Sequence, residues 1–363
     1  MKYYIISGEA SGDMHASNLV VSIREKDNAA IFRAWGGDKL KAERVDLVKH
    51  VQDLAFMGFW EVLKNIITVV SNIRFCKSDL LKFSPDALIL VDYPGFNIHI
   101  AKFAKRNGIK VFYYISPQIW AWKKNRIKQL KKLIEKIFII LPFEKKFFKE
   151  NNLEVEYVGH PLLDEIAKDD FLFSLQANKP IIALFPGSRK QEIKRILPKM
   201  LSIVDEFSDY LFVVATINSI EINFYKRIIG NKNVLLSNNE SYGLLKKAIA
   251  ALVTSGTATL ETALFNVPQV VCYKTNVITF LLAKQMVTTR FISLVNIIMD
   301  KLVVKELIQS GLNKKNLLSA LTNILDNTER EKILNNYKQL KSRLGEKGAS
   351  DKVANLIITD LIK

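Results

Sequence analysis

Short apolar runs alternate with longer segments of helical spacing along most of the chain, and this alternation predicts parallel β-sheets covered by helices. In the first half we expect strands at 2–7, 85–91, 110–115, 137–140 and 155–158. In the second half we expect them at 181–185, 211–215, 234–236, 250–254 and 269–273, before a wholly helical pattern over 316–363. The predicted fold class is therefore α/β, with two Rossmann-like domains built on parallel sheets and a helical C-terminus.

The length of 363 residues is too great for one ordinary core and suits two domains, for which 49% of apolar residues suffices. The strand series restarts after residues 169–178, which we interpret as a linker. We expect one domain over 1–168, a second over 169–345, and a last helix over 346–363 that packs back on the first domain.

The charge balance is strongly basic, because 53 Lys and Arg residues against 36 Asp and Glu residues leave a net charge of +17. Such a balance indicates an anionic partner: nucleic acid, a phosphorylated substrate or a membrane surface. Many basic residues gather between Lys123 and Lys149, where a solvated helix face is the plain alternative. Aromatic residues are not interleaved with them as a base-stacking platform requires, which argues against nucleic acid.

The cysteines and the apolar runs indicate a compartment. Cys76 and Cys272 are the only cysteines, and neither lies in a metal-ligand spacing, so a reducing compartment is indicated. The N-terminus has the pattern of a strand rather than a signal peptide, and no apolar run is long enough to span a bilayer. We expect a cytoplasmic protein, either soluble or peripherally bound to a membrane.

Two strand–turn–helix segments in the second half are typical of phosphate-binding turns. One runs from Thr254 to Glu261 through a Ser-Gly-Thr turn, and the other contains Pro186 to Arg189. Such turns expose backbone N–H groups at the positive end of a helix dipole, which favours a bound phosphate. The pair suggests a bound diphosphate, and the guanidinium of Arg189 could donate two hydrogen bonds to its oxygens. For either turn alone, an ordinary strand–helix connection that binds no ligand is the alternative.

Carboxylates follow two strands of the first half. The first strand ends in the loop Ser7 to Asp13, after which we expect a helix from about Met14 to Glu25. This loop lacks the G-x-G-x-x-G spacing of nicotinamide-binding folds. Asp92 ends the apolar strand 85–91, so it is expected in the ligand crevice of a parallel sheet, unless it only forms the turn.

Two aromatic segments have open interpretations. Residues 56–70 combine helical spacing with an unusually wide apolar side that includes Phe59 and Trp60. Core packing is the plain explanation, but an exposed apolar face beside basic residues would suit an acyl chain or a membrane. Trp120 and Trp122 could be core anchors or a platform for a sugar.

These motifs, taken in order, resemble the lipid A disaccharide synthase family of bacterial glycosyltransferases. The resemblance extends from Met1 to about Gln309. The matching segments are SGEASGD (7–13), MGFWEVL (57–63), DYPGFN (92–97), SPQIWAW (116–122), LPFE (141–144), YVGHP (157–161), LFPGSR (184–189) and TSGTATLE (254–261). Two positions depart from the family's pattern: Gly95 stands where an acidic residue is usual, and Val295 where a proline is usual.

The resemblance implies a GT-B fold, whose first domain binds the lipid acceptor and whose second binds a UDP-sugar. It implies inverting transfer of 2,3-diacylglucosamine from UDP-2,3-diacylglucosamine to 2,3-diacylglucosamine 1-phosphate. The products are UDP and the β-1′,6-linked lipid A disaccharide 1-phosphate. The family acts at the cytoplasmic face of the inner membrane, so anionic lipids are an expected partner, nucleic acid is not, and no cofactor is expected.

Inversion at an anomeric carbon needs a base for the incoming hydroxyl and a group that stabilises the leaving diphosphate. We take Asp92 as the first candidate for the base, with Asp13 and Glu9 as second candidates. Glu261 is placed to accept the ribose hydroxyls, or else it only complements its helix dipole. The chain contains no Asp-x-Asp pair, so no metal is expected.

The remaining site residues divide between the two substrates. The expected UDP-binding residues are Gly187, Ser188, Arg189, Glu192, Ser255, Gly256, Thr257, Ala258, Glu261, Tyr273 and Asn296. The expected acceptor- and lipid-binding residues are Ser11, Gly12, Phe59, Trp60, Gln118 and Trp120.

Two other functions fit parts of this pattern. A nucleotide-sugar epimerase of the same two-domain architecture would need neither an acyl-binding face nor a second sugar. A basic protein that binds RNA or membranes without catalysis is the alternative from another class.

Overall fold

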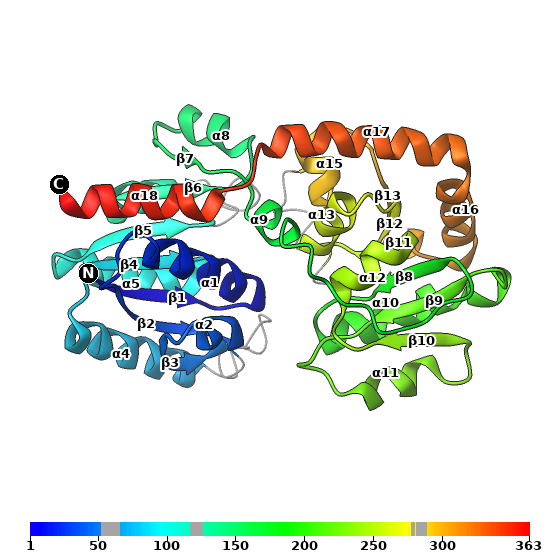
Figure 1. Ribbon diagram of the computed structural model, residues 1–363, viewed down its shortest axis with the longest axis horizontal. Coiled ribbons are helices and arrows are strands. Elements are labelled where there is room, and N and C mark those ends of the chain that lie inside the picture. The colour runs from blue at the N-terminus through cyan, green and yellow to red at the C-terminus, as the bar shows by residue number, and fades with distance from the viewer. Residues whose placement is uncertain (52–65, 117–125, 277–279, 281–288) are drawn as a thin grey trace. The chain divides into compact units, whose positions relative to one another are not determined.

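Figure 1 shows the computed structural model of the chain, which describes residues 1–51, 66–116, 126–276, 280 and 289–363. The chain divides into two compact units, each built on its own parallel sheet. Unit 1 comprises Met1–Asp164 and Glu346–Lys363, and unit 2 comprises Glu165–Gly345. The last helix therefore belongs to the same unit as the N-terminus.

The sheet of unit 1 has the strand order β3-β2-β1-β4-β5-β6-β7, and every strand pair in it is parallel. Its strands are β1 (Lys2–Ser7), β2 (Ile31–Gly36), β3 (Asp46–His50), β4 (Ala87–Val91), β5 (Lys110–Tyr114), β6 (Lys136–Ile139) and β7 (Glu156–Tyr157). The described helices around it are α1 (Ala10–Arg24), α2 (Asp38–Ala42), α4 (Ile66–Phe83), α5 (Pro94–Arg106), α7 (Arg126–Leu133), α8 (Glu144–Glu150) and α18 (Ala349–Ile362), and α9 (Leu162–Ile166) spans the boundary with unit 2.

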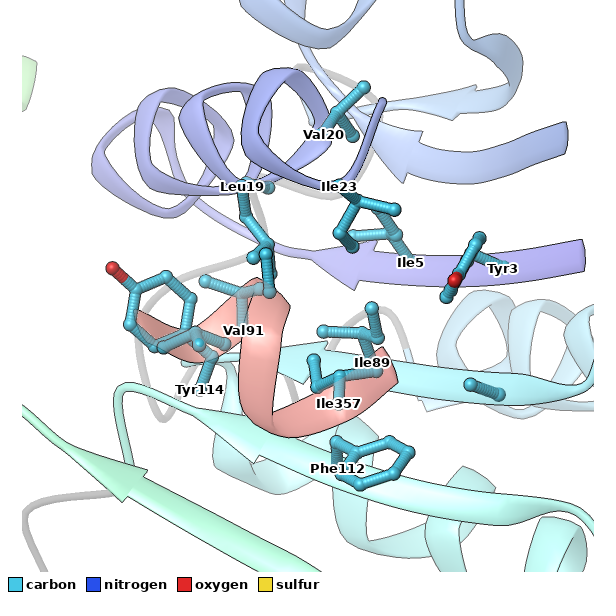
Figure 2. Packing of buried hydrophobic residues seen from close by; sticks show 14 of the residues in the cluster. Tyr3, Ile5, Leu19, Val20, Ile23, Ile89, Val91, Phe112, Tyr114 and Ile357 are labelled. Atoms are coloured by element: carbon cyan, nitrogen blue, oxygen red, sulfur yellow. The ribbon is translucent and has the colours of Figure 1, made fainter. Parts of the chain in front are cut away.

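The two faces of this sheet are both buried, as expected for parallel strands. On β1, Tyr3 and Ile5 point to one face, whereas Tyr4 and Ile6 point to the other. The first face packs against α1 and α18, and Figure 2 shows Ile357 of α18 beside Ile89 of β4. Each fully buried side chain of this kind contributes roughly 1.5–3 kcal/mol to stability.

Helix α4 is fastened to the second face by a buried carboxylate. Asp79 accepts hydrogen bonds from Nε and Nη2 of Arg33 at 2.9 and 2.7 Å, and from the hydroxyl of Tyr4 at 2.7 Å. The hydroxyl of Tyr4 in turn accepts from Nε1 of Trp35 at 2.9 Å. Because the carboxylate is both paired and hydrogen-bonded, its burial is compensated, and α4 has a fixed rotation about its axis.

The sheet of unit 2 has the order β10-β9-β8-β11-β12-β13, again with every pair parallel. Its strands are β8 (Ile181–Phe185), β9 (Leu211–Ala215), β10 (Val234–Ser237), β11 (Ala248–Thr254), β12 (Gln269–Tyr273) and β13 (Lys305–Ile308). The described helices are α10 (Lys190–Leu201), α11 (Ile222–Ile229), α12 (Ser241–Lys247), α13 (Thr257–Leu264), α15 (Leu294–Met299), α16 (Lys314–Leu325) and α17 (Asn327–Leu344). Short 3₁₀ turns lie at Val204–Glu206 and Gln309–Gly311.

The predicted fold class, two parallel α/β sheets followed by a helical C-terminus, is confirmed. The helical C-terminal pattern is broken between α17 and α18 by two glycines in left-handed conformations, Gly345 with φ 80° and Gly348 with φ 104°. Glycine adopts such angles without a steric penalty, so these residues end one helix and begin the next. The strands β2, β3 and β13 were not predicted from the sequence.

Candidate active site

In unit 1, strand order reverses between β1 and β4, which are neighbours in register at Ser7 and Val91. Ligands of open parallel sheets bind in the crevice at the carboxyl ends of the strands where the order reverses. Glu9 follows β1 and Asp92 follows β4. Both carboxylates are therefore at the position where such a fold binds its ligand.

Asp92 lies in a loop that is held under backbone strain. Asp92 and Tyr93 both adopt left-handed conformations, with φ 49° and 51°. The carbonyl oxygen of Asp92 accepts hydrogen bonds from Nδ2 of Asn97 and from the hydroxyl of Tyr113, each at 2.7 Å. Each left-handed non-glycine residue costs about 1–3 kcal/mol, so these two bonds keep Asp92 in a conformation that the free loop would leave.

The electrostatic surroundings of Asp92 suit a general base. Burial, and to a smaller extent the negative charge of Glu9, raise the pKa of Asp92 to about 6, while the N–H of Tyr93 opposes the shift. A base is most effective when its pKa lies near the working pH. Asp92 as a whole residue is half-buried.

Asp13, the second candidate for the base, has a different role in this structure. Its buried carboxylate accepts hydrogen bonds from the backbone N–H groups of Gly37 at 2.6 Å, Lys39 at 2.9 Å and Leu40 at 3.3 Å. These donors form the N-terminus of α2, where a negative charge is stabilising. The structure thus assigns Asp13 to holding α2.

The segment 7–13 is not the open loop that the sequence predicts. Helix α1 begins at Ala10 instead of about Met14, with Glu9 as its N-cap residue. Ser11 and Gly12 therefore lie in the first helical turn, and a Cβ on Gly12 would stand 3.4 Å from the Cβ of Ser7. The small residues of this segment allow close packing of α1 on the sheet.

Gly8 is required by the loop that carries Asp92. A Cβ on Gly8 would stand 2.2 Å from Cγ of Tyr93, so only glycine leaves room for the tyrosine ring. Tyr93 also stacks on Phe96, with ring centroids 5.4 Å apart. The two loops at the end of β1 and β4 therefore pack directly on each other.

In unit 2, strand order reverses between β8 and β11, and the two predicted phosphate turns follow these neighbouring strands. Gly187 in the first turn has φ 115° and Gly256 in the second has φ 154°, angles that glycine adopts readily. Gly256 is exposed, and a Cβ there would meet nothing within 4 Å. Ser255, Thr257 and Ala258 beside it are half-buried. The two turns lie together at the ligand-binding edge of this sheet.

A carboxylate occupies the first of these turns. Glu192 accepts a hydrogen bond from the N–H of Ser188 at 3.2 Å and another from Nη1 of Arg189 at 3.0 Å. Its Oε2 lies so close to Gly187 that a Cβ there would approach it to 2.6 Å. The turn therefore already holds an anion on two of the groups expected to hold phosphate, and a phosphate bound there has to displace Glu192.

Glu261 lies on α13 and accepts a hydrogen bond from the hydroxyl of Tyr242 at 3.0 Å. Burial raises the pKa of Glu261 to about 7, the bond from Tyr242 lowers it, and the nearby Glu165 raises it. Tyr273, at the end of β12, has a pKa raised by burial and then by the charge of Glu192. Tyr242 was missed in the sequence, because an aromatic residue at the start of a short helix has no distinctive signal.

Asn296 serves the loop that contains it. Its Oδ1 accepts from the N–H groups of Val303 and Val304 at 2.8 and 2.9 Å, and its Nδ2 donates to the carbonyl of Val304 at 2.8 Å and to Glu306 at 2.9 Å. These bonds use the full capacity of the amide. Its side chain has none left for a nucleotide, so we assign Asn296 to positioning the segment that Ser255 contacts through the carbonyl of Ile292 at 2.8 Å.

Four of the expected acceptor- and lipid-binding residues, Phe59, Trp60, Gln118 and Trp120, lie outside the described residues. Helix α4, which follows the undescribed residues 52–65 in the chain, exposes apolar side chains: Ile67 is 83% exposed, Phe75 50% and Val70 41%. Within the described residues, no helix is long and apolar enough to cross a bilayer. No three His, Cys, Asp or Glu side chains of that same part gather as a metal site requires.

Two parallel-sheet domains, each with its crevice at a reversal of strand order, define the GT-B class, which contains nucleotide-sugar enzymes. Solved structures of other proteins have a similar fold. UDP-GlcNAc 2-epimerase from Neisseria meningitidis, bound to UDP-GlcNAc, has a TM-score of 0.68 and 16% identity over 99% of this chain and 100% of that chain. The glycotransferase of kitacinnamycin has a TM-score of 0.66 and 13% identity over 99% of both chains. At these identities the likeness shows the fold alone.

The sequence comparisons are more specific. The family described as Lipid-A-disaccharide synthetase matches residues 3–358. The lipid-A-disaccharide synthase of Syntrophus aciditrophicus is 37% identical over 373 residues, covering 99% of this chain and 97% of that protein. That of Coxiella burnetii strain RSA 331 is 34% identical, covering 97% and 96%. The chain belongs to the lipid-A-disaccharide synthetase family, and it is a glycosyltransferase of lipid A biosynthesis.

Proposed function

We propose that the protein transfers 2,3-diacylglucosamine from UDP-2,3-diacylglucosamine to the 6-hydroxyl of 2,3-diacylglucosamine 1-phosphate. The product is the β-1′,6-linked disaccharide 1-phosphate. Membership of the family supports this substrate pair. The structural observation that carries the proposal is Asp92, a half-buried residue with a left-handed backbone and a raised pKa at the carboxyl end of β4.

In the proposed reaction, Asp92 removes the proton of the acceptor 6-hydroxyl. The oxygen forms a bond to the anomeric carbon while the bond from that carbon to the diphosphate breaks, and UDP leaves with the electron pair. Attack opposite to the leaving group inverts the anomeric configuration. A positioned base contributes roughly 10²–10⁴-fold to the rate. Burial, with a smaller contribution from the charge of Glu9, raises the pKa of Asp92 to about 6, which favours proton transfer near neutral pH.

We assign UDP to unit 2. Arg189 and the N–H groups of the two turns, at Ser188 and at Gly256 to Ala258, would stabilise the charge that develops on the leaving diphosphate. Glu261 would accept the ribose hydroxyls. Two neighbouring turns at one reversal of strand order support this assignment.

A transfer assay tests the function. With UDP-diacylglucosamine labelled in the sugar, release of UDP is expected to require diacylglucosamine 1-phosphate, and the label is expected in a disaccharide. Epimerisation of the labelled sugar without acceptor would favour the epimerase. RNA retention on filters with a steep dependence on salt, and no affinity for UDP, would favour the non-catalytic alternative.

We also propose that the protein attaches peripherally to the cytoplasmic face of the inner membrane. The exposed apolar side chains of α4, with Arg74 exposed beside them, support this, as does the net charge of +17. Apolar side chains enter the boundary between headgroups and acyl chains, while each basic residue near anionic lipids adds roughly 1 kcal/mol.

Replacing Ile67 and Val70 together by serine is expected to weaken binding to vesicles of phosphatidylethanolamine and phosphatidylglycerol by roughly tenfold, because two apolar contacts are lost. Sedimentation with vesicles measures the change. The matched control is Leu302→Ser, which removes a 60% exposed leucine from unit 2 and is expected to leave binding unchanged. Equal binding by all three proteins would contradict attachment through α4.

A further inference from the structure

Tyr242 contacts the carboxylate of Glu261, which we propose as the group that binds the ribose. Its hydroxyl donates to Oε1 of Glu261 at 3.0 Å. Glu261 lies four residues after Thr257, about one helical turn along α13 from the exposed phosphate turn. Tyr242 comes from a different helix, α12. A side chain outside the two turns therefore determines where the carboxylate of Glu261 points.

The ring of Tyr242 is held on two sides by aromatic residues. Phe171 meets it edge-on with centroids 5.0 Å apart, and Phe265 lies 5.3 Å away at a tilt of 43°. The chain beside Phe171 also packs closely on α12, because a Cβ on Gly243 would lie only 1.8 Å from the carbonyl oxygen of Leu172. The hydroxyl of Tyr242 thus has a fixed position from which it orients Glu261.

The charges around Glu261 make this bond important near neutral pH. Burial raises the pKa of Glu261 to about 7, and the charge of Glu165, on α9, adds to the rise. Glu165 itself pairs with Lys168 at 2.6 Å. The hydrogen bond from Tyr242 acts in the opposite direction and favours the carboxylate. The bond from Tyr242 therefore partly offsets the rise in the pKa of Glu261.

We propose that Tyr242 is a positioning residue for the nucleotide, and that its hydroxyl holds Glu261 in the orientation that accepts the 2′- and 3′-hydroxyls of the ribose. This inference rests on the proposed binding of UDP by unit 2. It extends the nucleotide site to the aromatic cluster of Phe171, Tyr242 and Phe265.

The test is calorimetry of Tyr242→Phe with two ligands, UDP and 2′,3′-dideoxy-UDP. The variant keeps the ring and its packing but loses the donor. We expect UDP to bind about five- to tenfold more weakly at pH 7, and the dideoxy analogue to bind as it does to the parent protein. Tyr225→Phe, at a buried tyrosine on α11, is the matched control and is expected to change neither affinity.

The pH profile gives a second readout that ring packing alone would not change. Affinity for UDP is expected to fall as the pH falls through about 7, because Glu261 becomes protonated. Without the donor of Tyr242 the pKa of Glu261 is higher, so in Tyr242→Phe the fall begins at a higher pH. The dideoxy analogue should show no such displacement.

The outcomes separate this inference from the function on which it rests. Equal weakening of both ligands, or unchanged affinity for UDP, in Tyr242→Phe would overturn the positioning role. Glu261→Gln measures the ribose contact itself and is expected to abolish the preference for UDP over the dideoxy analogue. If Glu261→Gln loses that preference and Tyr242→Phe keeps it, only the role of Tyr242 is wrong. If Glu261→Gln keeps it, Glu261 does not bind ribose, and both assignments fail.

Discussion

Replacing Asp92 by asparagine is expected to lower turnover by at least about 100-fold, because the amide cannot take the proton of the acceptor hydroxyl. The two side chains are nearly isosteric, and asparagine tolerates the left-handed backbone that Asp92 adopts at φ 49°. The melting temperature should therefore barely change. UDP affinity should also persist, since we assign UDP to unit 2. Initial rates of transfer and calorimetry with UDP measure the two quantities.

Asp13→Asn is the control for this result. Because the carboxylate of Asp13 holds three backbone N–H groups of α2, its replacement is expected to lower the melting temperature first. Near-normal turnover in Asp92→Asn, together with lost turnover and unchanged stability in Asp13→Asn, would move the base to the first loop. Gly95 sharpens the comparison, because no other carboxylate in 92–97 can substitute for Asp92.

The pH dependence follows from the same site. Asp92 acts as a base only when ionised, so turnover should rise with pH through about 6, where Asp92 titrates. The negative charge of Glu9 contributes to that raised pKa, so Glu9→Gln should move the rise to lower pH. Loss of all turnover in Glu9→Gln, with normal folding, would instead indicate that Glu9 is the base.

Replacing Arg189 by alanine is expected to weaken UDP binding and turnover together, by about 10- to 150-fold. Such a loss corresponds to the roughly 1.5–3 kcal/mol of a charge-assisted hydrogen bond. In the free protein Arg189 donates a hydrogen bond to Glu192. The measured loss is therefore the difference between the bond from Arg189 to phosphate and its bond to Glu192. Calorimetry with UDP gives the affinity, and the transfer assay gives the rate.

Lys190→Ala is the matched control for Arg189→Ala. Lys190 is the next residue, is exposed, and has the same charge. If binding depended only on net positive charge near the turn, the two variants would lose similar affinity. Unchanged UDP affinity in Arg189→Ala would remove this residue from the diphosphate site.

The architecture could be predicted from the sequence because parallel strands buried on both faces appear as continuous apolar runs. Ala87–Val91 and Ile181–Phe185 are fully buried and fall within the expected limits. Strands at the edges of the sheets carry a weaker signal. β3 contains Asp46 and Lys49, and β13 begins Lys305-Glu306. These charged residues interrupt the apolar run by which a buried strand is recognised in the sequence.

The site could be predicted only where local chemistry determines it. The strand–turn–helix segments at Pro186 and Ser255 were predicted, and the structure has them on neighbouring strands, while their binding of phosphate stays a prediction. The roles of Asp13 and Asn296 could not be found, because their partners are backbone groups whose approach depends on tertiary packing. Their residue types alone are equally compatible with catalysis, ligand binding and loop support.

The single carboxylate of Asp13 has a consequence for local unfolding. It belongs to the first turn of α1, four residues after Glu9, whereas its three donors belong to the segment that begins α2. Since the three amides bond to one buried carboxylate, opening the start of either helix removes hydrogen bonds from a buried charge, which is costly. We therefore expect the first turns of α1 and α2 to oppose each other's local opening, which would also restrain the loop that carries Glu9.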